Sequence, residues 1–457
     1  MSNLLDKASI LLTPTAYNNG SMLSVKPTDG DGDFTFVRGS AATRVNAQGL
    51  VENVQIISSE LVTNGDFSNG STGWTVINGN ITDKYNASMT AYQSGIRITP
   101  FNKTGKFKVL FDLVITSGNM KFDAGGVNNQ TYTTSGTKEI IIINPTKFEF
   151  NAFNLGWVGT LDNVSVKEIT EDTNLPRINY EGFSYDGNGD IIPNSGCGSW
   201  LLERQSTNLY LNSETLVTQS NATSASTYTV SFYGSGSITF SGTHIGSLVG
   251  NGADERVSVT FTATSGTLTS TIIGSVNKGQ LEEQSFATSY IPTEGATNTR
   301  NQDIATNSGN ATLINSTEGT IYFELNKVNK NSSSRFIGIT DSTAFSNRVQ
   351  MVSFANSDLF RLEFVVGGVQ LSINYVETEN IFKKYAITYD INLIRLYING
   401  VKIGEIANTV GLPLANTFES LNFSRNGGGN PFFGKTKCVA VFKEALTDAE
   451  LQSLTTI

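Results

Sequence analysis

Few side chains in this sequence could carry acid–base or nucleophilic chemistry. The one histidine, His244, lies within residues 242–246 between two expected short strands, and no Gly-x-Ser-x-Gly motif accompanies it. A Ser/His/Asp or Cys/His catalytic set would have to be built on this histidine. Because a titrating role needs a placed partner, we expect His244 to be an ordinary exposed or hydrogen-bonded residue. One histidine and two cysteines also exclude metal sites of the His/Cys type.

Paired carboxylates would be the signature of a glycosidase, which needs two acids facing each other across the sugar. The nearest pair is Glu377 and Glu379, at alternate positions just before an expected turn. Carboxylates in such a place are usually solvated, and we expect that here. The sequence therefore predicts a protein that is not an enzyme, with polysaccharide hydrolysis as the less favoured alternative.

Aspartates alternate with glycines in residues 29–33, which suggests a calcium loop. An EF-hand loop needs Gly at its sixth position and Glu at its twelfth, where this chain has Phe34 and Ser40. Residues 186–190 repeat the pattern and fail the same test. Since Gly and Asp are the usual turn residues, we expect solvated turns and neither a metal nor a cofactor.

Sugar binding needs aromatic platforms and a few polar groups, because a pyranose face is apolar and its rim carries hydroxyls. The candidates are Trp74, Trp157 and Trp200. Burying a large apolar side chain contributes roughly 1.5 to 3 kcal/mol, enough to retain it without a ligand. The core is favoured for Trp74 and a framework role for Trp200. For Trp157, which lies near an expected sheet edge, both interpretations stay open.

Length and composition bound the fold. A chain of 457 residues predicts about three domains. Hydrophobic residues make up 38% and charged residues 16%, with 44 Gly against 9 Pro, which is typical of many turns between strands. The net charge of -9 argues against nucleic acid or an anionic membrane as the main partner. We therefore expect an all-β protein.

The search for targeting signals and the number of thiols bear on the compartment in which the protein is made. The first 18 residues hold no basic leader or cleavage-site pattern, and no window approaches a membrane span. Cys197 and Cys438 lie far apart and in no motif, so we expect two reduced, semi-buried thiols. The sequence thus predicts assembly in a cytoplasm without membrane insertion.

The last third of the chain shows the clearest β pattern. Apolar residues alternate in residues 385–389, 394–398 and 401–406, and Asn399-Gly400 is a strong hairpin signal between the last two runs. Further short β-branched or aromatic runs, separated by turn residues, predict a sandwich of two antiparallel sheets. These runs are residues 320–325, 335–339, 349–354, 361–366 and 370–375.

The same region resembles the laminin-G or concanavalin-A-like lectin/glucanase fold. The resemblance rests on residues 318–322, 385–389, 396–400, 433–435 and 442–447. It implies glycan binding, with hydrolysis in a minority of members, although the Glu-x-Asp-x-x-Glu strand of the glucanases does not occur here. It also implies a closing helix, for which Thr447 and Glu450 supply a capping box. Asp341 falls in a loop where members often place a calcium or ligand group.

Another set of phrases resembles bacteriophage virion fibre and decoration proteins. They are residues 34–46, 176–180, 201–209 and 287–293, the last followed by Thr297 and Arg300. This resemblance implies an N-terminal framework that docks to other virion proteins. Between the first two phrases, residues 59–170 resemble an inserted jelly-roll carbohydrate-binding module, with strands at residues 95–99, 106–115, 138–143 and 147–153. Such an insertion is cheap, because loop-closure entropy rises only about 0.6 kcal/mol per doubling of length.

Together these patterns predict several antiparallel β-sandwiches. The expected domains are a docking framework (1–58), the inserted jelly roll (59–170), a framework continuation with a small second sandwich (171–300), a linker (301–318) and the lectin-like domain (319–457). The predicted function is that of a head or tail fibre or decoration protein of a virion. Its partners would be virion proteins and host surface glycans. Because weak glycan contacts gain affinity when several copies bind together, we expect a symmetric homo-oligomer, a trimer. A purely structural spacer is the alternative. Trp74, Trp157 and Asp341 are the candidate carbohydrate-binding residues.

Overall fold

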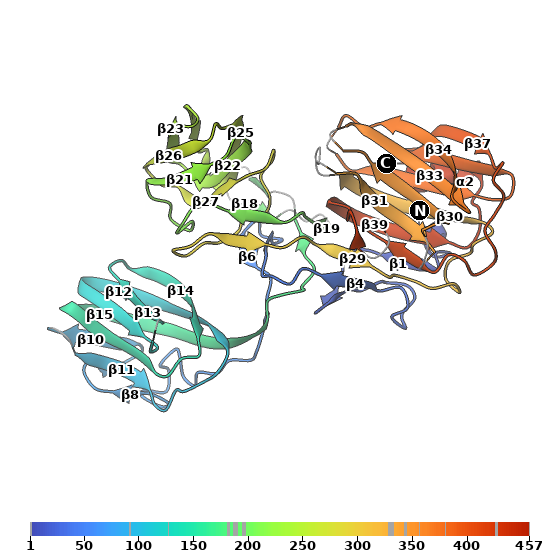
Figure 1. Cartoon of the computed structure of the whole chain (residues 1–457). Helices are drawn as coiled ribbons and strands as arrows, with labels where there is room; N and C mark the ends of the chain where they lie inside the picture. The colour runs from blue at the N-terminus through green and yellow to red at the C-terminus, as the bar shows by residue number, and fades with distance from the viewer. Residues whose placement is uncertain are drawn as a thin grey trace. The chain divides into compact units, whose positions relative to one another are not determined.

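The computed structural model describes residues 2–90, 93–126, 128–180, 183–185, 191–193, 198–327, 333–341, 345–355, 357–379, 381–425 and 428–456. The chain separates into two compact units (Figure 1), one formed by Met1–Val54 with Thr173–Ile457 and the other by Gln55–Asp172. The predicted all-β class is confirmed. No helix in the described residues is long and apolar enough to cross a membrane. Cys197 and residues 186–190 lie outside the described residues.

The unit Gln55–Asp172 is built around two long strands, β12 (Lys106–Asp123) and β15 (Phe148–Glu171). They pair along most of their length, with three register shifts that interrupt the ladder. The predicted strands of this region are confirmed. The remaining strands are β7 (Ile56–Ile57), β8 (Thr75–Val76), β9 (Asn80–Ile81), β10 (Tyr85–Met89), β11 (Ser94–Ile98), β13 (Asn129–Tyr132) and β14 (Gly136–Ile143).

A small sandwich follows in the other unit, as predicted. One sheet has the order β21 (Gln219–Thr223), β26 (Gly266–Ile273), β23 (Ser237–Gly242), β24 (Gly246–Val249). The other has the order β25 (Gly252–Thr262), β22 (Thr227–Gly234), β27 (Asn277–Glu282). Tyr228, Phe232, Phe240 and Leu268 are among the apolar side chains buried between the sheets.

The C-terminal sandwich places a five-stranded sheet against an eight-stranded one. The first has the order β34 (Val369–Val376), β33 (Leu359–Val366), β32 (Arg348–Ser353), β31 (Arg335–Thr340), β38 (Ser420–Asn422). The second contains β39 (Gly434–Phe442), β30 (Gly319–Lys327), β35 (Lys383–Tyr389), β36 (Leu393–Ile398) and β37 (Val401–Ala407) in this order.

Local signals in this sandwich are confirmed. Asn399 and Gly400 both take positive φ, 46° and 80°, as a hairpin turn of this type requires. Helix α2 (Asp448–Thr455) begins after Thr447, whose side chain accepts a hydrogen bond from the backbone of Glu450, and the reciprocal bond completes the capping box. The element boundaries here therefore follow from residues close together in sequence.

Strands from distant parts of the chain complete the eight-stranded sheet. β1 (Ile10–Leu12) pairs with residues 439–441 of β39, and β19 (Ser199–Leu202) pairs with residues 434–436 of the same strand. β16 (Ile178–Asn179) then pairs with β19. The segments predicted as a separate docking framework are thus integral to this sheet. Whether they also dock to a particle stays a prediction.

The segment predicted as a linker, residues 301–318, is packed rather than free. Its strand β29 (Ile304–Thr306) pairs with β4 (Phe34–Val37), and Ala305 and Ile314 are buried in the main core. Its Asn-, Thr- and Gly-rich composition hid these two apolar positions. The remaining short elements are α1 (Ser2–Leu5), β2 (Tyr17–Asn18), β3 (Ser21–Met22), β5 (Thr43–Val45), β6 (Val51–Asn53), β17 (Phe183–Tyr185), β18 (Ile191–Pro193), β20 (Ser206–Asn208) and β28 (Asn298–Arg300).

Candidate functional site

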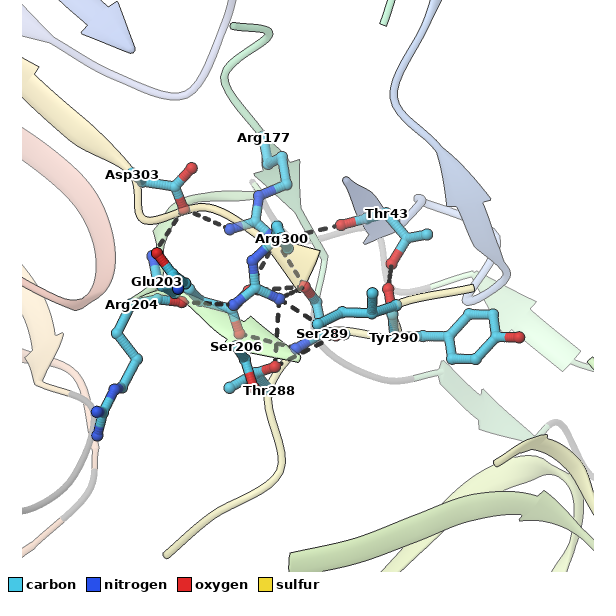
Figure 2. Close-up of polar contacts among 12 residues, drawn as sticks. Thr43, Arg177, Glu203, Arg204, Ser206, Thr288, Ser289, Tyr290, Arg300 and Asp303 are labelled. Carbon is cyan, nitrogen blue, oxygen red and sulfur yellow. Dashed lines mark hydrogen bonds and ion pairs between the residues drawn. The ribbon is translucent and has the colours of Figure 1, made fainter. Parts of the chain in front are cut away.

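A buried network of charged side chains lies at the junction of the framework segments (Figure 2). At its centre the Arg177 guanidinium pairs with Asp303 and, at 2.7 Å, with Glu203. Arg177 also donates to the Ser289 hydroxyl at 2.6 Å and to the Thr43 carbonyl at 3.3 Å. Its side chain is fully enclosed. Because these partners come from four separate segments of the chain, Arg177 holds the segments together.

Two further arginines close the network. Arg300 approaches Glu203 at 3.2 Å and donates to the Arg204 carbonyl at 2.7 Å. The Arg204 side chain itself points away from the cluster (Figure 2). Arg38 pairs with Asp303 at 3.3 Å, and burial lowers the pKa of Arg38 to about 10. The network is therefore a chain of alternating charges rather than a single ion pair.

Electrostatics keep Glu203 ionised. Burial by itself would raise its pKa, but the charges of Arg300 and Arg177 and the hydrogen bonds from Ser289 outweigh burial and hold this pKa far below the usual range. A carboxylate held this way is poorly suited to take up a proton near neutral pH. The network is thus built for cohesion, not for proton transfer.

The network unites the phrases that resemble virion proteins. Arg38 belongs to residues 34–46, Arg177 to residues 176–180, Glu203 to residues 201–209, and Ser289 to residues 287–293. These phrases are recognisable in the sequence, but the network between them was not predicted. The available signal was the presence of charged residues in three of the four phrases, since residues 287–293 carry none.

A pocket of about 270 Å³ adjoins the network. Thr43, Glu203 and Ser289 form part of its lining, together with Tyr233 and Arg256 from the small sandwich. The Arg256 guanidinium donates to the Ser231 hydroxyl at 2.7 Å and to the Thr288 carbonyl. This pocket was not predicted, because its walls come from segments far apart in sequence.

Both tryptophans predicted as sugar platforms lie in the core of their unit. Trp157 has no exposed surface, and Trp74 is 7% exposed. The Trp74 indole packs 5.2 Å from the Phe67 ring and donates to the Asn64 carbonyl at 3.0 Å. Trp157 packs 5.8 Å from the Tyr85 ring. Neither ring can therefore stack on a sugar in this conformation. Each instead fills the core, as the packing alternative predicted.

Asp341 lies in the loop after β31 and is 7% exposed. Its Oδ2 accepts hydrogen bonds at 2.9 Å from both the backbone and the side-chain nitrogen of Asn347. These bonds give Asp341 a role in shaping the loop. Among the residues that the structure describes, no cluster of three or more Asp, Glu, His or Cys side chains is placed to hold a metal ion. A ligand role for Asp341 stays a prediction.

The glutamate pair is only partly solvated, so the expectation for Glu377 was wrong. Glu377 is 2% exposed; its carboxylate lies 3.0 Å from the Lys383 ammonium and accepts from the Tyr385 hydroxyl at 3.1 Å. Lys383 also lies 3.1 Å from the exposed Glu379 carboxylate. Although burial lowers the pKa of Lys383, the hydrogen bonds that its ammonium donates to the Tyr375 hydroxyl and to both glutamates raise it overall. One cation thus pairs with both acids.

The other predicted chemical groups have structural surroundings. The His244 ring stacks on Phe261 with 3.9 Å between centroids, and burial lowers its pKa. Asp33 accepts hydrogen bonds from the Ser24 backbone at 2.7 Å and from its hydroxyl at 2.9 Å, so it fixes a turn. Cys438 is a buried free thiol, and burial raises its pKa to about 12.

The outer face of the five-stranded sheet carries a second concentration of arginines. Alternation along β31, β32 and β33 directs Phe336, Arg348 and Arg361 away from the core, since Ile337, Val349 and Leu362 point into it. β31 and β33 are labelled in the C-terminal sandwich of Figure 1. Phe345 and Phe354 lie at the two ends of β32, and Arg425 follows β38.

These residues stack in pairs, and we call them the Arg–Phe face: Phe336, Phe345, Arg348, Phe354, Arg361 and Arg425. The Phe345 ring has the Arg348 guanidinium 4.5 Å and the Arg425 guanidinium 4.7 Å from its centroid. Arg361 lies 4.5 Å above Phe354. All the members are partly or well exposed. This face was not predicted from the sequence.

One carboxylate lies among these cations. Glu363 approaches Arg348 at 3.3 Å and Arg361 at 3.8 Å, and it accepts from the buried Gln350 amide at 2.7 Å. Arg425 has no ion pair with any described residue. The Arg–Phe face therefore carries more positive than negative charge, on a chain whose net charge is -9.

Comparisons with known proteins support the fold of this region. Residues 296–452 match the family model of the concanavalin A-like lectin/glucanases superfamily. No curated protein matches the chain in sequence.

Several solved structures are similar to part of the chain. The Ruminococcus gnavus IT-sialidase CBM40 bound to alpha2,3 sialyllactose is 17% identical, with a TM-score of 0.28, over 32% of this chain and 86% of that chain. The leech intramolecular trans-sialidase is 20% identical, with a TM-score of 0.27, over 31% of this chain and 24% of that one. A native heptameric SAP-like pentraxin from Limulus polyphemus is 13% identical, with a TM-score of 0.25, over 30% and 70%. These values are too low to transfer a ligand to this chain.

Proposed function

We propose that this protein is a structural component of a bacteriophage virion, a head or tail fibre or decoration protein that displays glycan-binding β-sandwiches for adhesion to host surfaces. The observation that carries the glycan-binding part is the lectin/glucanase family match over residues 296–452. Since a fold family does not by itself choose between binding and hydrolysis, the surroundings of the candidate carboxylates are the further support for binding.

The described carboxylates favour binding over bond cleavage. Hydrolysis of a glycoside needs one acid to protonate the leaving group and a second to act on the opposite side of the sugar. Glu377 is enclosed and shares Lys383 with Glu379, so this pair offers no opening between the acids for a sugar ring. A depolymerase built on this pair would need both contacts to break.

The virion part of the proposal is supported by the four phrases that resemble fibre and decoration proteins. The buried network ties them into one junction, as a shared scaffold would require. Docking to other virion proteins through the N-terminal part, and location on the particle, follow from the resemblance. The same proposal makes the chain a homo-oligomer, most simply a trimer. Several weak glycan contacts made together gain roughly 10² to 10⁴ in apparent affinity.

The test of glycan binding uses the full-length chain on immobilised host surface polysaccharides and on a glycan array, with light scattering to measure the oligomeric state. Retention on at least one polysaccharide, strengthened by oligomerisation, is the expected result. If no host polysaccharide retains the oligomer, the adhesive role is wrong and the protein is a structural spacer.

The test of the virion role is separate. Purified particles are probed with antibodies against the chain and viewed by electron microscopy. Labelling at the head or the tail is expected. Absence of the chain from particles whose host cells express it would overturn the virion assignment, whatever the glycan array shows.

A further inference from the structure

We infer that the Arg–Phe face is a binding site for acidic polysaccharides, in which the guanidinium groups pair with carboxylate or sulfate groups carried by the sugar chain. This inference rests on the proposed glycan binding and names its substrate class. It is carried by three arginines gathered on one sheet face, Arg348, Arg361 and Arg425, each with its guanidinium carbon 4.5 to 4.7 Å from the centroid of an aromatic ring.

Stacking prepares these guanidinium groups for recognition. A guanidinium that lies over a ring keeps its N–H groups in its own plane and aims them sideways, where a carboxylate or sulfate can accept two of them. Arg348 and Arg425 flank the same Phe345 ring, so two such planes are held close together. Arg425 also contacts the Phe336 ring at 5.8 Å, which limits its rotation. Less side-chain entropy is then lost when an anion binds.

The internal carboxylate does not satisfy these cations. Glu363 faces Arg348 and Arg361 at 3.3 and 3.8 Å, while one of its oxygens also accepts from Gln350. Two arginines thus share one carboxylate, and Arg425 has none among the described residues. Arg361 also donates to the neutral Asn374 side chain, and Arg348 to the Phe345 carbonyl, both at 2.9 Å. Arg348 and Arg361 side chains are 15% and 27% exposed, so an external anion can reach them.

The geometry favours an extended polymer over a single small anion. Arg348 and Arg361 lie on neighbouring strands but at different levels of the sheet, because Arg348 pairs with Val365 and Arg361 pairs with Val352. The cations are therefore spread along the sheet rather than focused on one point. Nucleic acid fits less well, because arginines already occupy the ring faces on which bases would stack and the chain as a whole is acidic.

The experiment measures retention of the full-length protein on three immobilised polymers: polygalacturonate, dextran sulfate and neutral dextran. The site variant combines Arg348→Gln, Arg361→Gln and Arg425→Gln. A matched control combines Lys138→Gln, Lys278→Gln and Lys402→Gln, which lie elsewhere and change the net charge equally. Thermal unfolding and circular dichroism check that both variants fold.

The expected result is retention on an acidic polymer that weakens about tenfold or more in the site variant, while the control variant behaves like the wild type. Retention should also fall when salt rises from about 0.05 to 0.5 M, because exposed charges are screened. The polygalacturonate and dextran sulfate columns show whether carboxylate or sulfate is preferred.

Two outcomes would overturn the inference. Equal losses in the site and control variants would show that only net charge matters. Binding to neutral polysaccharides alone, unchanged in the site variant, would place the glycan elsewhere and leave the proposed adhesion intact. If the site variant fails to fold, single Phe345→Leu and Arg425→Gln variants repeat the comparison, since removal of one ring or one exposed cation should still lower retention severalfold.

Discussion

The buried network and the Arg–Phe face use the same side chain in opposite ways. In the network, Arg177 is enclosed and its donors meet carboxylates, a hydroxyl and a backbone carbonyl. On the face, Arg425 is exposed and rests between two phenylalanine rings without an ion pair in the described residues. The two terminal nitrogens of Arg177 are occupied by contacts within the fold, whereas Arg425 makes no ion pair with a described residue.

This difference separates a structural role from a binding role. Breaking a buried ion pair leaves an unpaired charge in a medium that solvates it poorly, so its loss is felt as instability. Losing an exposed, stacked arginine costs little stability, because water replaces its contacts. The residue type alone therefore does not predict whether an arginine stabilises the fold or binds a ligand. The share of its hydrogen-bond donors that already have partners within the protein indicates which of the two roles it has. Each variant below tests one side of this contrast.

The largest effect is expected for Arg177→Met, which leaves Glu203 and Asp303 without their central partner. We expect the unit containing the network to lose about 3 to 5 kcal/mol of unfolding free energy. Denaturant unfolding of the full chain measures this, with the two units followed as separate transitions. The matched variant Arg361→Gln should shift stability by only about 0.5 kcal/mol. Similar losses in the two variants would remove the distinction between the network and the face.

Acid should weaken the network next. The pKa of Glu203 is lowered in the folded state relative to its ordinary value of 4.5. Its ionised form thus contributes stability above that ordinary value, and the contribution is lost as pH falls below about 4.5 towards the folded-state pKa. We expect unfolding of wild type to become easier across this range and Glu203→Gln to show a shallower dependence.

A second carboxylate supplies the control for the acid experiment. Burial raises the pKa of Glu60, but hydrogen bonds from Ser165, Val166, Val62 and Leu61 outweigh this and lower it. Glu60 lies in the other unit. Glu60→Gln should therefore change the acid dependence of that unit's transition only. An unchanged pH profile in Glu203→Gln would show that this carboxylate does not control the acid stability of the network.

How well an element of the fold could be predicted depended on whether the residues that determine it lie close together in the sequence. Strands and turns in the C-terminal sandwich followed from alternation and from Asn399-Gly400, because period and turn chemistry are local properties. The pairing of β1 and β19 with β39 could not be predicted, since no local pattern states which distant edge a strand will join. For residues 301–318, polar composition concealed Ala305 and Ile314, whose burial depends on β4 as a partner.

The sites depended even more on tertiary context. Trp157 was open to two interpretations because a ring near an expected sheet edge can face either way, and only packing against Tyr85 places it inside. The Arg–Phe face had a usable signal, since Phe336, Arg348 and Arg361 all alternate with core residues. What the sequence lacked was the folding back of Phe345 and Arg425 over that face, which comes from loops after different strands.

The smallest effect is expected for Glu363→Gln, which removes the carboxylate from the Arg–Phe face but keeps an oxygen that can accept from Gln350. Retention on an acidic polysaccharide should increase about two- to fivefold, the size of a partly exposed ion pair of roughly 0.4 to 1 kcal/mol. The control is Glu379→Gln, an exposed acid of the same sandwich that changes net charge equally. If Glu363→Gln binds less tightly than wild type while Glu379→Gln does not, Glu363 orients the arginines instead of competing with the ligand. The comparison between arginines whose donors are occupied within the fold and arginines whose donors are available to a ligand would then have to include Glu363, the carboxylate that positions the latter.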